Sequence, residues 1–128
     1  MIDWREKTRN FLLGQPALTA LTGQRIYASD QLPPIYKPSD GVAILFGLRG
    51  GGMDYTSRVI RIATQFRIYG PDLSQIITAD RTLFNLLNDA ETCFLSARLD
   101  IPGQQLTHPD TLWKFVLTFY QLHFQNDY

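Results

Sequence analysis

The residue types that most often carry catalysis are few in this sequence and lie far apart. The two histidines, His108 and His123, have no histidine, cysteine or paired carboxylates at the spacing of a metal site. The single cysteine, Cys93, lies in an apolar stretch that lacks the cationic surroundings of a reactive thiol. No serine falls in a nucleophile-elbow pattern. The sequence therefore predicts no catalytic residue, no metal ligand and no cofactor, and we expect that the chain is not an enzyme.

A run of three glycines, residues 50–52, is the segment most easily mistaken for a phosphate-binding loop. Such a loop needs a lysine followed by serine or threonine at the start of a helix, whereas this run leads into a strand-like segment. The whole segment, residues 47–57, is too long for a tight hairpin turn, and its glycines predict a flexible arm between two strands. The side chains of the arm that suit docking on a protein partner are Arg49, Met53, Asp54 and Tyr55.

Further cationic side chains lie in residues 58–69, an alternating run rich in β-branched and aromatic residues that predicts a strand. Alternation places Arg61 and Arg67 on one face and the apolar residues on the other. The cationic face is either solvated, as is common in antiparallel sheets, or meets a neighbouring subunit or a lumen. Arg58 has the parity of the apolar face, so we group it with Arg49 at the arm.

Two helices are predicted at the start of the chain, ahead of the sheet. Residues 2–13 combine apolar and charged side chains in a partly amphipathic pattern, with Asp3 as the N-cap and Gly14 as the stop signal. Pro16 then opens a short second helix, and residues 25–27 follow as a short extended stretch. These elements are expected to pack on a sheet formed by the rest of the chain.

The strongest helical periodicity runs over residues 71–88, between segments that read as strands. Strands are predicted at residues 42–46, 58–69, 93–99 and 112–124, with a proline-rich loop at 29–41 and a turn-rich segment at 100–110. This order predicts an α+β fold: an antiparallel sheet of about four strands with helices packed on one face. The last strand is apolar on both faces, so it is either central in the sheet or its second face meets a partner.

Length and composition predict a single domain over residues 1–128. Apolar residues make up 45% of the 128 positions, which is the composition of a globular chain that buries a core. Twelve lysines and arginines balance twelve aspartates and glutamates, so no global field favours nucleic acid or an anionic membrane surface. No stretch approaches the roughly 20 apolar residues of a membrane span, and no leader pattern opens the chain. We expect a soluble protein made in a cytoplasm.

The layout of these elements resembles the tail terminator, or tail completion, proteins of long-tailed phages, of the minor tail protein U type. The resemblance covers most of the chain. It is carried by the opening helix and residues 16–27, by a Leu32-Pro33-Pro34 segment leading into residues 42–45, and by the long strand that precedes the helix after Gly70-Pro71. The most family-like piece is Ala-Leu-Thr-Gly-Gln-Arg-Ile-Tyr, residues 20–27.

The resemblance implies a structural role in a virus particle. It implies a ring, a hexamer in the family, that stacks on the last ring of tail-tube protein, stops tube polymerisation and offers the surface to which the filled head is joined. The expected partners are other copies of the chain, the tail tube protein and a head–tail connector or neck protein, with DNA only in passage through the lumen and no membrane. The expected location is the head-proximal end of the virion tail, and the host cytoplasm during assembly. The candidates for the subunit or tube interface are Arg49, Met53, Asp54, Tyr55, Arg58, Arg61 and Arg67.

Two alternatives remain open at this point. A head–tail connector, neck or baseplate adaptor subunit would share these features and differ in its partners. A small nucleic-acid-binding module is the second alternative, although zero net charge argues against it. Such a module would use the arginines Arg58, Arg61 and Arg67 with the aromatic residues Tyr55, Phe66 and Tyr69.

Overall fold

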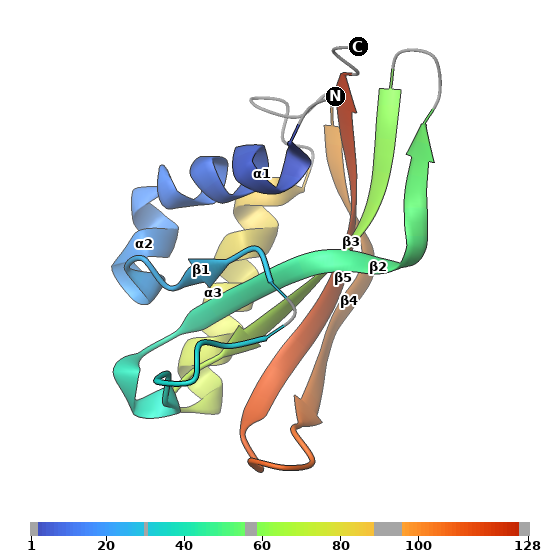
Figure 1. The fold of residues 1–128 in the computed structure, drawn as a ribbon. Helices are drawn as coiled ribbons and strands as arrows, with labels where there is room; N and C mark the ends of the chain where they lie inside the picture. The colour runs from blue at the N-terminus through green and yellow to red at the C-terminus, as the bar shows by residue number, and fades with distance from the viewer. Residues whose placement is uncertain (1–2, 30, 56–58, 89–95, 126–128) are drawn as a thin grey trace.

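The computed structural model describes residues 3–29, 31–55, 59–88 and 96–125, with the backbone alone at 50–55, 59, 96 and 125 (Figure 1). In these residues three α-helices and five strands form an α+β fold, the class that the sequence predicted. The strands are β1 (Ile26–Tyr27), β2 (Ala43–Tyr55), β3 (Val59–Tyr69), β4 (Ser96–Thr107) and β5 (Lys114–Gln125).

The strands form a single sheet in the order β1-β2-β3-β5-β4. Every neighbouring pair is antiparallel except β1 and β2, which are parallel over the two pairs that begin with Ile26 opposite Ile44. The predicted antiparallel sheet of four strands is therefore present, and β1 adds a fifth strand. Two residues are too few to give an alternating pattern in the sequence, which is why this stretch was predicted only as extended.

The first two helices begin and end at the predicted signals. Asp3 caps α1 (Trp4–Leu13), because its carboxylate accepts a hydrogen bond from the backbone N–H of Glu6 at 3.3 Å. Pro16 occupies the first turn of α2 (Pro16–Thr22), where its missing N–H costs no hydrogen bond. The two helices pack in sequence along the edge of the sheet that carries β1.

The third helix, α3 (Leu73–Leu87), begins later than the Pro71 predicted to lie in its first turn. Asp72 is the N-cap instead, and its carboxylate accepts from the backbone N–H of Gln75 at 2.8 Å. This helix contacts β3, β4 and β5, and it also packs on α2. All three helices lie on the same face of the sheet, as predicted (Figure 1).

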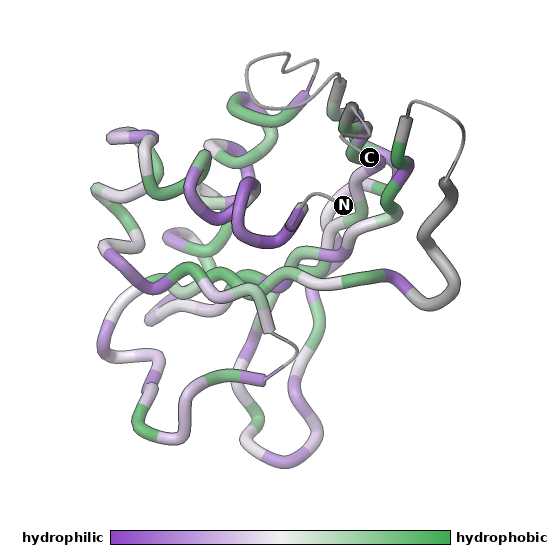
Figure 2. The backbone as a smooth tube through the Cα atoms, turned by 45° about the horizontal axis from the view of Figure 1, so that its top comes forward, coloured by the Kyte–Doolittle hydropathy of each residue, from purple (hydrophilic) through white to green (hydrophobic). Residues whose placement is uncertain are grey.

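The main core lies between this face and the helices. A chain of aromatic rings crosses it: Trp4 of α1 packs on Phe46 at 6.2 Å between ring centroids, Phe46 on Phe66 at 5.6 Å, and Phe66 on Tyr120 at 5.3 Å. All four side chains are at most 5% exposed. Figure 2 shows the contrast in hydropathy between the green start of β2, which runs through this core, and the largely purple α1, which presents its charged side to solvent.

The predicted two-faced pattern of β3 is confirmed on its apolar side. Five side chains of alternate residues, Ile60, Ile62, Thr64, Phe66 and Ile68, are buried against the helices. On the other face Arg61 is exposed, but Tyr69 is only 3% exposed because the segment between β1 and β2 folds across this end of the sheet. A second, smaller core forms there from Tyr36, Ala43, Leu45, Tyr69 and Phe115.

The glycine-rich segment differs from the prediction of an arm between two strands. β2 continues to Tyr55, and its residues Met53 to Tyr55 pair with β3. The register shifts between Leu48 and Met53, so the glycines form a bulge within the strand instead of a connection between strands. A glycine run breaks the apolar alternation that marks a strand, and the ladder on either side of it depends on pairing that lies outside the local sequence. Residues 56–57, also predicted as part of the arm, lie outside the described residues.

The segment predicted as turn-rich, residues 100–110, is also partly strand, because β4 extends to Thr107. Two register shifts against β5 accommodate it, one on each side of Ile101. β4 is an edge strand, and an edge tolerates proline and glycine because one side of it has no neighbouring strand to bond. Pro102 and Gly103 therefore lie within the strand. The first three residues of the predicted strand, 93–95, including Cys93, lie outside the described residues.

The last strand is central in the sheet, which was one of the two predicted alternatives. β5 pairs with β3 along one side and with β4 along the other. One face of β5 packs under α3, and the other carries Leu117 and Phe119, which are only half-buried. The second apolar face of this strand is thus the middle of the sheet surface that no helix covers.

Candidate interaction surface

The sheet face opposite the helices, which we call the open face, carries three of the seven predicted interface residues, Arg49, Arg61 and Arg67. Its members come from the central strands and the bulged edges: Arg49, Arg61, Gln65, Arg67, Asp100, Leu117, Phe119 and Gln121. Most of them are half-buried, and Arg61 is exposed. The open face is therefore a mixed surface in which cationic side chains surround apolar ones, the composition typical of a protein contact.

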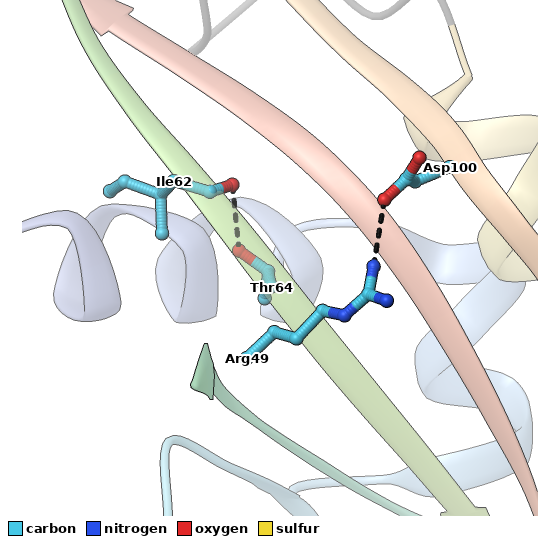
Figure 3. Close-up of polar contacts among 4 residues, drawn as sticks. All are labelled: Arg49, Ile62, Thr64 and Asp100. Atoms are coloured by element: carbon cyan, nitrogen blue, oxygen red, sulfur yellow. Dashed lines mark hydrogen bonds and ion pairs between the residues drawn. The ribbon is translucent and has the colours of Figure 1, made fainter. Parts of the chain in front are cut away.

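An ion pair crosses the open face from one edge strand to the other. The guanidinium of Arg49 on β2 donates to the carboxylate of Asp100 on β4 at 3.0 Å (Figure 3). Between them lies Phe119 of β5, with the Arg49 guanidinium carbon 4.3 Å from its ring centroid. The light green β3 and pale orange β4 ribbons flank the pink β5 ribbon in this view. On the opposite, helix-facing side, the buried Thr64 hydroxyl donates to the Ile62 carbonyl at 3.4 Å.

This contact requires a strongly curved sheet. Two strands lie between β2 and β4, so on a flat sheet the edges would be about 14 Å apart. Both residues also lie at register shifts, where a bulge bends the strand and redirects a side chain. We infer that the curl and the two bulges bring Arg49 and Asp100 together, so that the open face is concave where these two residues meet.

At the end of the sheet near the β4–β5 turn, the open face holds a cavity of about 370 Å³. Its walls come from the loop before β2, from β2 and β3, and from the segment between β4 and β5. Three aromatic side chains line it. The ring of Trp113 meets Tyr36 edge-on at 5.9 Å and Tyr69 at 6.5 Å between centroids. Tyr36 is fixed in place because its hydroxyl donates to the carbonyl of Gly41 at 2.7 Å.

The polar groups of this cavity include a guanidinium and two phenols. Arg67 is half-buried, lies over the Phe115 ring at 5.9 Å, and has its Nε buried with no hydrogen-bond partner among the described residues. Burial raises the pKa of Tyr69, although the adjacent Arg67 guanidinium opposes this. Burial likewise raises the pKa of Tyr36 to about 12. Both phenols are therefore neutral at physiological pH, and Arg67 supplies the charge of the site.

His108 also lines the cavity, and its tautomer follows from its hydrogen bonds. Its Nδ1 accepts from the backbone N–H of Asp110 at 3.2 Å and of Thr111 at 3.4 Å. An accepting Nδ1 carries no proton, so in the neutral ring Nε2 is the N–H donor.

Two apolar side chains stand exposed on the loops around this end of the molecule. Ile35 is 87% exposed on the segment before β2, and Leu112 is 73% exposed between β4 and β5. Leu112 also has a backbone φ of +61°, a left-handed conformation that a leucine rarely adopts. Exposed apolar side chains on a strained loop are uncommon in a surface that meets only water.

A second polar cluster lies on the helix side of the sheet, under α3. The Thr118 hydroxyl donates to the Asp80 carboxylate at 2.8 Å, and burial raises the pKa of Asp80 despite this bond. The nearby hydroxyl of Tyr120 is buried and has no hydrogen-bond partner among the described residues. β4 reaches this cluster at Gly103, where an added Cβ would lie 2.8 Å from Asp80 Oδ2. A glycine is therefore required at this bulge.

The predicted interface residues do not form one group. Arg49 is engaged with Asp100, Arg61 is exposed on the open face, and Arg67 lines the cavity. Three others, Met53, Asp54 and Tyr55, have their backbone in β2, whereas their side chains are outside the described part of the chain. Arg58 lies outside the described residues altogether.

Sequence reasoning missed the partners of these arginines. Asp100 was assigned to a turn, and Tyr36 to a proline-rich loop, so neither was connected to the sheet. Trp113 was predicted to lie within the last strand, whereas β5 begins at Lys114, and the role of Trp113 in a cavity depends on loops that are distant in the sequence. The positions of Arg61 and Arg67 on one face were detectable because strict alternation extends through the whole of β3.

Two features are absent from the described residues. Among them, no three histidines, cysteines, aspartates or glutamates gather closely enough to hold a metal ion. None of the helices in this part of the chain combines the length and the apolar character needed to cross a membrane.

Comparison with known proteins gives a likeness of fold. No family model and no curated protein matches the chain. Among solved structures, the chain is similar to one chain of a structure described as the virion of a native gene transfer agent (GTA) particle. The TM-score is 0.63 at 13% sequence identity, and the alignment covers 96% of this chain and 95% of that chain. At this identity the likeness shows a shared fold, and its coverage shows that the fold is shared over the whole domain.

Proposed function

We propose that the chain is a structural subunit of a tailed phage or phage-like virion, and that it acts by assembly and not by catalysis. The observation that carries this proposal is the likeness of fold over 96% of the chain to a chain of a GTA virion. The open face, with its arginines around half-buried Leu117 and Phe119, supplies a surface for protein contact.

Within that class, the proposed role is tail termination. The chain forms a ring, expected to be a hexamer, that caps the tail tube, stops its polymerisation and provides the head-joining surface. The resemblance of residues 16–27 and of the element order to tail terminator proteins supports this role. The proposed partners are other copies of the chain, the tail tube protein and a connector or neck protein.

The direction of the strands supports a ring. From β2 to β4 the sheet contains four strands whose directions alternate, so its two outer strands run in opposite directions. If a copy is placed beside the first in the same orientation, β4 of one meets β2 of the next as an antiparallel pair. β1 covers β2 only at Ile44 and Leu45, which leaves the edge of β2 beyond Leu45 free of sheet pairing. Such a heterologous contact repeats from copy to copy and gives a ring when the rotation between neighbouring copies closes, which is the arrangement proposed here.

The arginines divide between two proposed tasks. Arg61 is exposed on the open face and is the candidate for facing a subunit or the lumen through which DNA passes. Arg67 is held in the aromatic cavity, so it is a candidate for protein contact only. A lumen with few exposed cations would let DNA pass without strong binding to its phosphates.

The test is the mass of the purified protein by light scattering over a range of concentrations, followed by electron microscopy with tubes assembled from the tail tube protein of the same particle. The proposal expects a closed ring that sits on tube ends and stops their growth. A monomer at all concentrations that leaves tubes growing contradicts tail termination. A ring that does not bind tubes but binds the portal end of filled heads would favour the connector alternative.

Hydrogen exchange locates the interface in the same experiment. Amides of β4 and of β2 beyond Leu45 are expected to gain protection when the protein moves from dilute monomer to ring. Protection gained in α1 and α2 with both sheet edges unchanged would show that the ring uses another contact. Salt-dependent binding of DNA by the monomer would instead favour the nucleic-acid alternative.

A further inference from the structure

The cavity at the end of the open face contains a charge for which the described residues supply no counter-charge. No carboxylate among the described residues pairs with Arg67, and its buried Nε has no acceptor. A half-buried guanidinium with an unsatisfied donor costs free energy unless an anion completes it. The cavity, about 370 Å³, is large enough for a carboxylate and the side chain that bears it.

We propose that this cavity is a binding site for a carboxylate side chain of a partner protein, a glutamate or aspartate flanked by apolar residues. Arg67 is the cation that receives the carboxylate, and the His108 imidazole is a second donor in the wall. A guanidinium binds a carboxylate through two parallel hydrogen bonds, which the free Nε–H of Arg67 can supply together with a terminal N–H.

The walls favour a protein over a free anion. Tyr36, Tyr69 and Trp113 together with Pro33 and Pro34 give the cavity a largely apolar wall, beside which a charge contact is stronger than in open water. The same walls suit the apolar neighbours of an acidic residue in a peptide, and Arg67 is the one guanidinium among the residues that line the cavity.

The rim of the site has the features of a docking surface. Ile35 and Leu112 are exposed apolar side chains on the two segments that also supply cavity walls. Leu112 is held there at a φ of +61°, a strain that is commonly retained where a side chain has a contact to make. A partner segment that inserts its carboxylate would cover both side chains. This site does not depend on ring formation, so its test can succeed or fail separately.

The probes are two capped tripeptides, acetyl-Leu-Glu-Leu-amide and acetyl-Leu-Gln-Leu-amide, titrated into the full chain and followed by ¹H–¹⁵N NMR. The chain has two tryptophans, and they serve as reporter and control. Trp113 lines the cavity, whereas Trp4 is in the main core on the other side of the sheet. We expect the glutamyl peptide to shift the Trp113 indole signal and leave that of Trp4 in place, with the glutaminyl peptide at least about ten-fold weaker.

Two variants on the same strand test the role of charge. Arg67→Met is expected to remove the preference for glutamate, so that the two peptides bind equally weakly. Arg61→Met is the matched control, because Arg61 lies on the same strand and face but is exposed and outside the cavity. Should Arg67→Met fail to fold, Arg67→Lys keeps the charge without the paired donors and is expected to weaken glutamyl binding several-fold.

Three outcomes would overturn the proposal. The first is equal binding of the two peptides to the unchanged protein. The second is an equal loss of binding in Arg61→Met and Arg67→Met, which would indicate a general surface charge effect. The third is saturable binding of inorganic phosphate at Trp113 with the affinity of the glutamyl peptide, which would assign the cavity to phosphate groups.

Discussion

The carboxylate of Asp100 and the guanidinium of Arg49 meet at 3.0 Å although they belong to the two edge strands of a four-stranded segment. Each residue lies at a bulge, and the ring of Phe119 lies beneath the pair. The contact is therefore a consequence of the curl of the sheet more than a cause of the curl. An ion pair whose side chains are 41% and 35% exposed contributes little free energy.

The strength of this pair can be measured by a double-mutant cycle of Arg49→Met and Asp100→Asn. We expect a coupling free energy below about 1 kcal/mol in urea unfolding, since exposed pairs typically give about 0.2 to 1 kcal/mol. The coupling is expected to fall between about 0.1 M and about 1 M salt, because the charges are screened. The cycle of Arg98→Met with Asp100→Asn is the control and is expected to show no coupling. A salt-independent coupling above about 2 kcal/mol would mean that the pair holds the curl.

Gly103→Ala is expected to destabilise the fold by about 1 to 3 kcal/mol, the range for overpacking a well-packed site. The new Cβ would lie 2.8 Å from both Asp80 Oδ2 and Val116 Cγ1, and 3.2 Å from Thr118 Oγ1. Gly14→Ala is the matched control, because its nearest contacts would be at 3.4 and 3.5 Å and its φ is −82°. Equal unfolding midpoints for the two variants would contradict the packing at the β4 bulge.

Asp80 predicts a pH dependence of stability. Burial raises its pKa above the ordinary 3.8, so the folded state binds the proton more tightly than the unfolded chain. This stabilising contribution is complete below the unfolded-state pKa and is lost as pH rises through the folded-state pKa. The variant Asp80→Asn has no carboxyl group at this position and so does not lose this contribution. The free energy of unfolding of Asp80→Asn relative to that of the unchanged protein should therefore rise as pH increases from about 3 upward.

Thr118→Val sharpens the same measurement. The Thr118 hydroxyl donates to the Asp80 carboxylate at 2.8 Å and thereby lowers the pKa of Asp80. Without it, the pKa is expected to rise further, so the loss of stability moves to higher pH. The readout is the free energy of unfolding of the three proteins across a pH series. A constant difference between the unchanged protein and Asp80→Asn would show that Asp80 does not titrate differently on folding.

The two buried tyrosines Tyr120 and Tyr36 predict opposite responses to removal of the hydroxyl. The Tyr120 hydroxyl has no partner among the described residues, so Tyr120→Phe is expected to be neutral or stabilising in thermal and urea unfolding. The Tyr36 hydroxyl donates to Gly41, so Tyr36→Phe is expected to cost about 1 kcal/mol. Equal losses in both variants would indicate that a water or a further group satisfies Tyr120.

Leu112 is expected to limit stability because of its left-handed backbone. Leu112→Asn should stabilise the fold by up to about 1 kcal/mol, since asparagine tolerates a φ of +61° and the lost side chain is 73% exposed. Leu106→Asn, at 40% exposure within β4, is the control and carries no such gain. Destabilisation by Leu112→Asn would show that the leucine is packed more closely than its exposure indicates.

The helices and most strands were predictable because their signals are local. Asp3, Pro16 and the periodicity of α3 depend on neighbours within a few residues, and the alternation of β3 is strict over its length. The bulged edges were not predictable, because a bulge breaks alternation and its strand pairing is supplied by a distant segment. The contact of Arg49 with Asp100 was not predictable for the same reason, because both residues lie at bulges and are fifty-one positions apart.

The candidate site was predictable only in part. Arg67 was identified from its face of β3, but its aromatic enclosure combines the segment before β2 with the segment between β4 and β5. Neither segment has a regular pattern, and the residue that completes the enclosure, Trp113, is more than forty positions from Arg67. Loops of this kind take their conformation from the elements that they connect.

The central position of β5 has a consequence for folding during synthesis on the ribosome. Ile62 of β3 lies opposite Leu122 of β5, sixty positions further along the chain, so β3 acquires its second neighbour only after all other strands have been synthesised. Until then β3 and β4 have unpaired sides that invite aggregation, and folding has a high contact order. A chain that stops before β5 therefore lacks the middle of its sheet and is a substrate for proteases, which keeps unfinished copies out of any assembly.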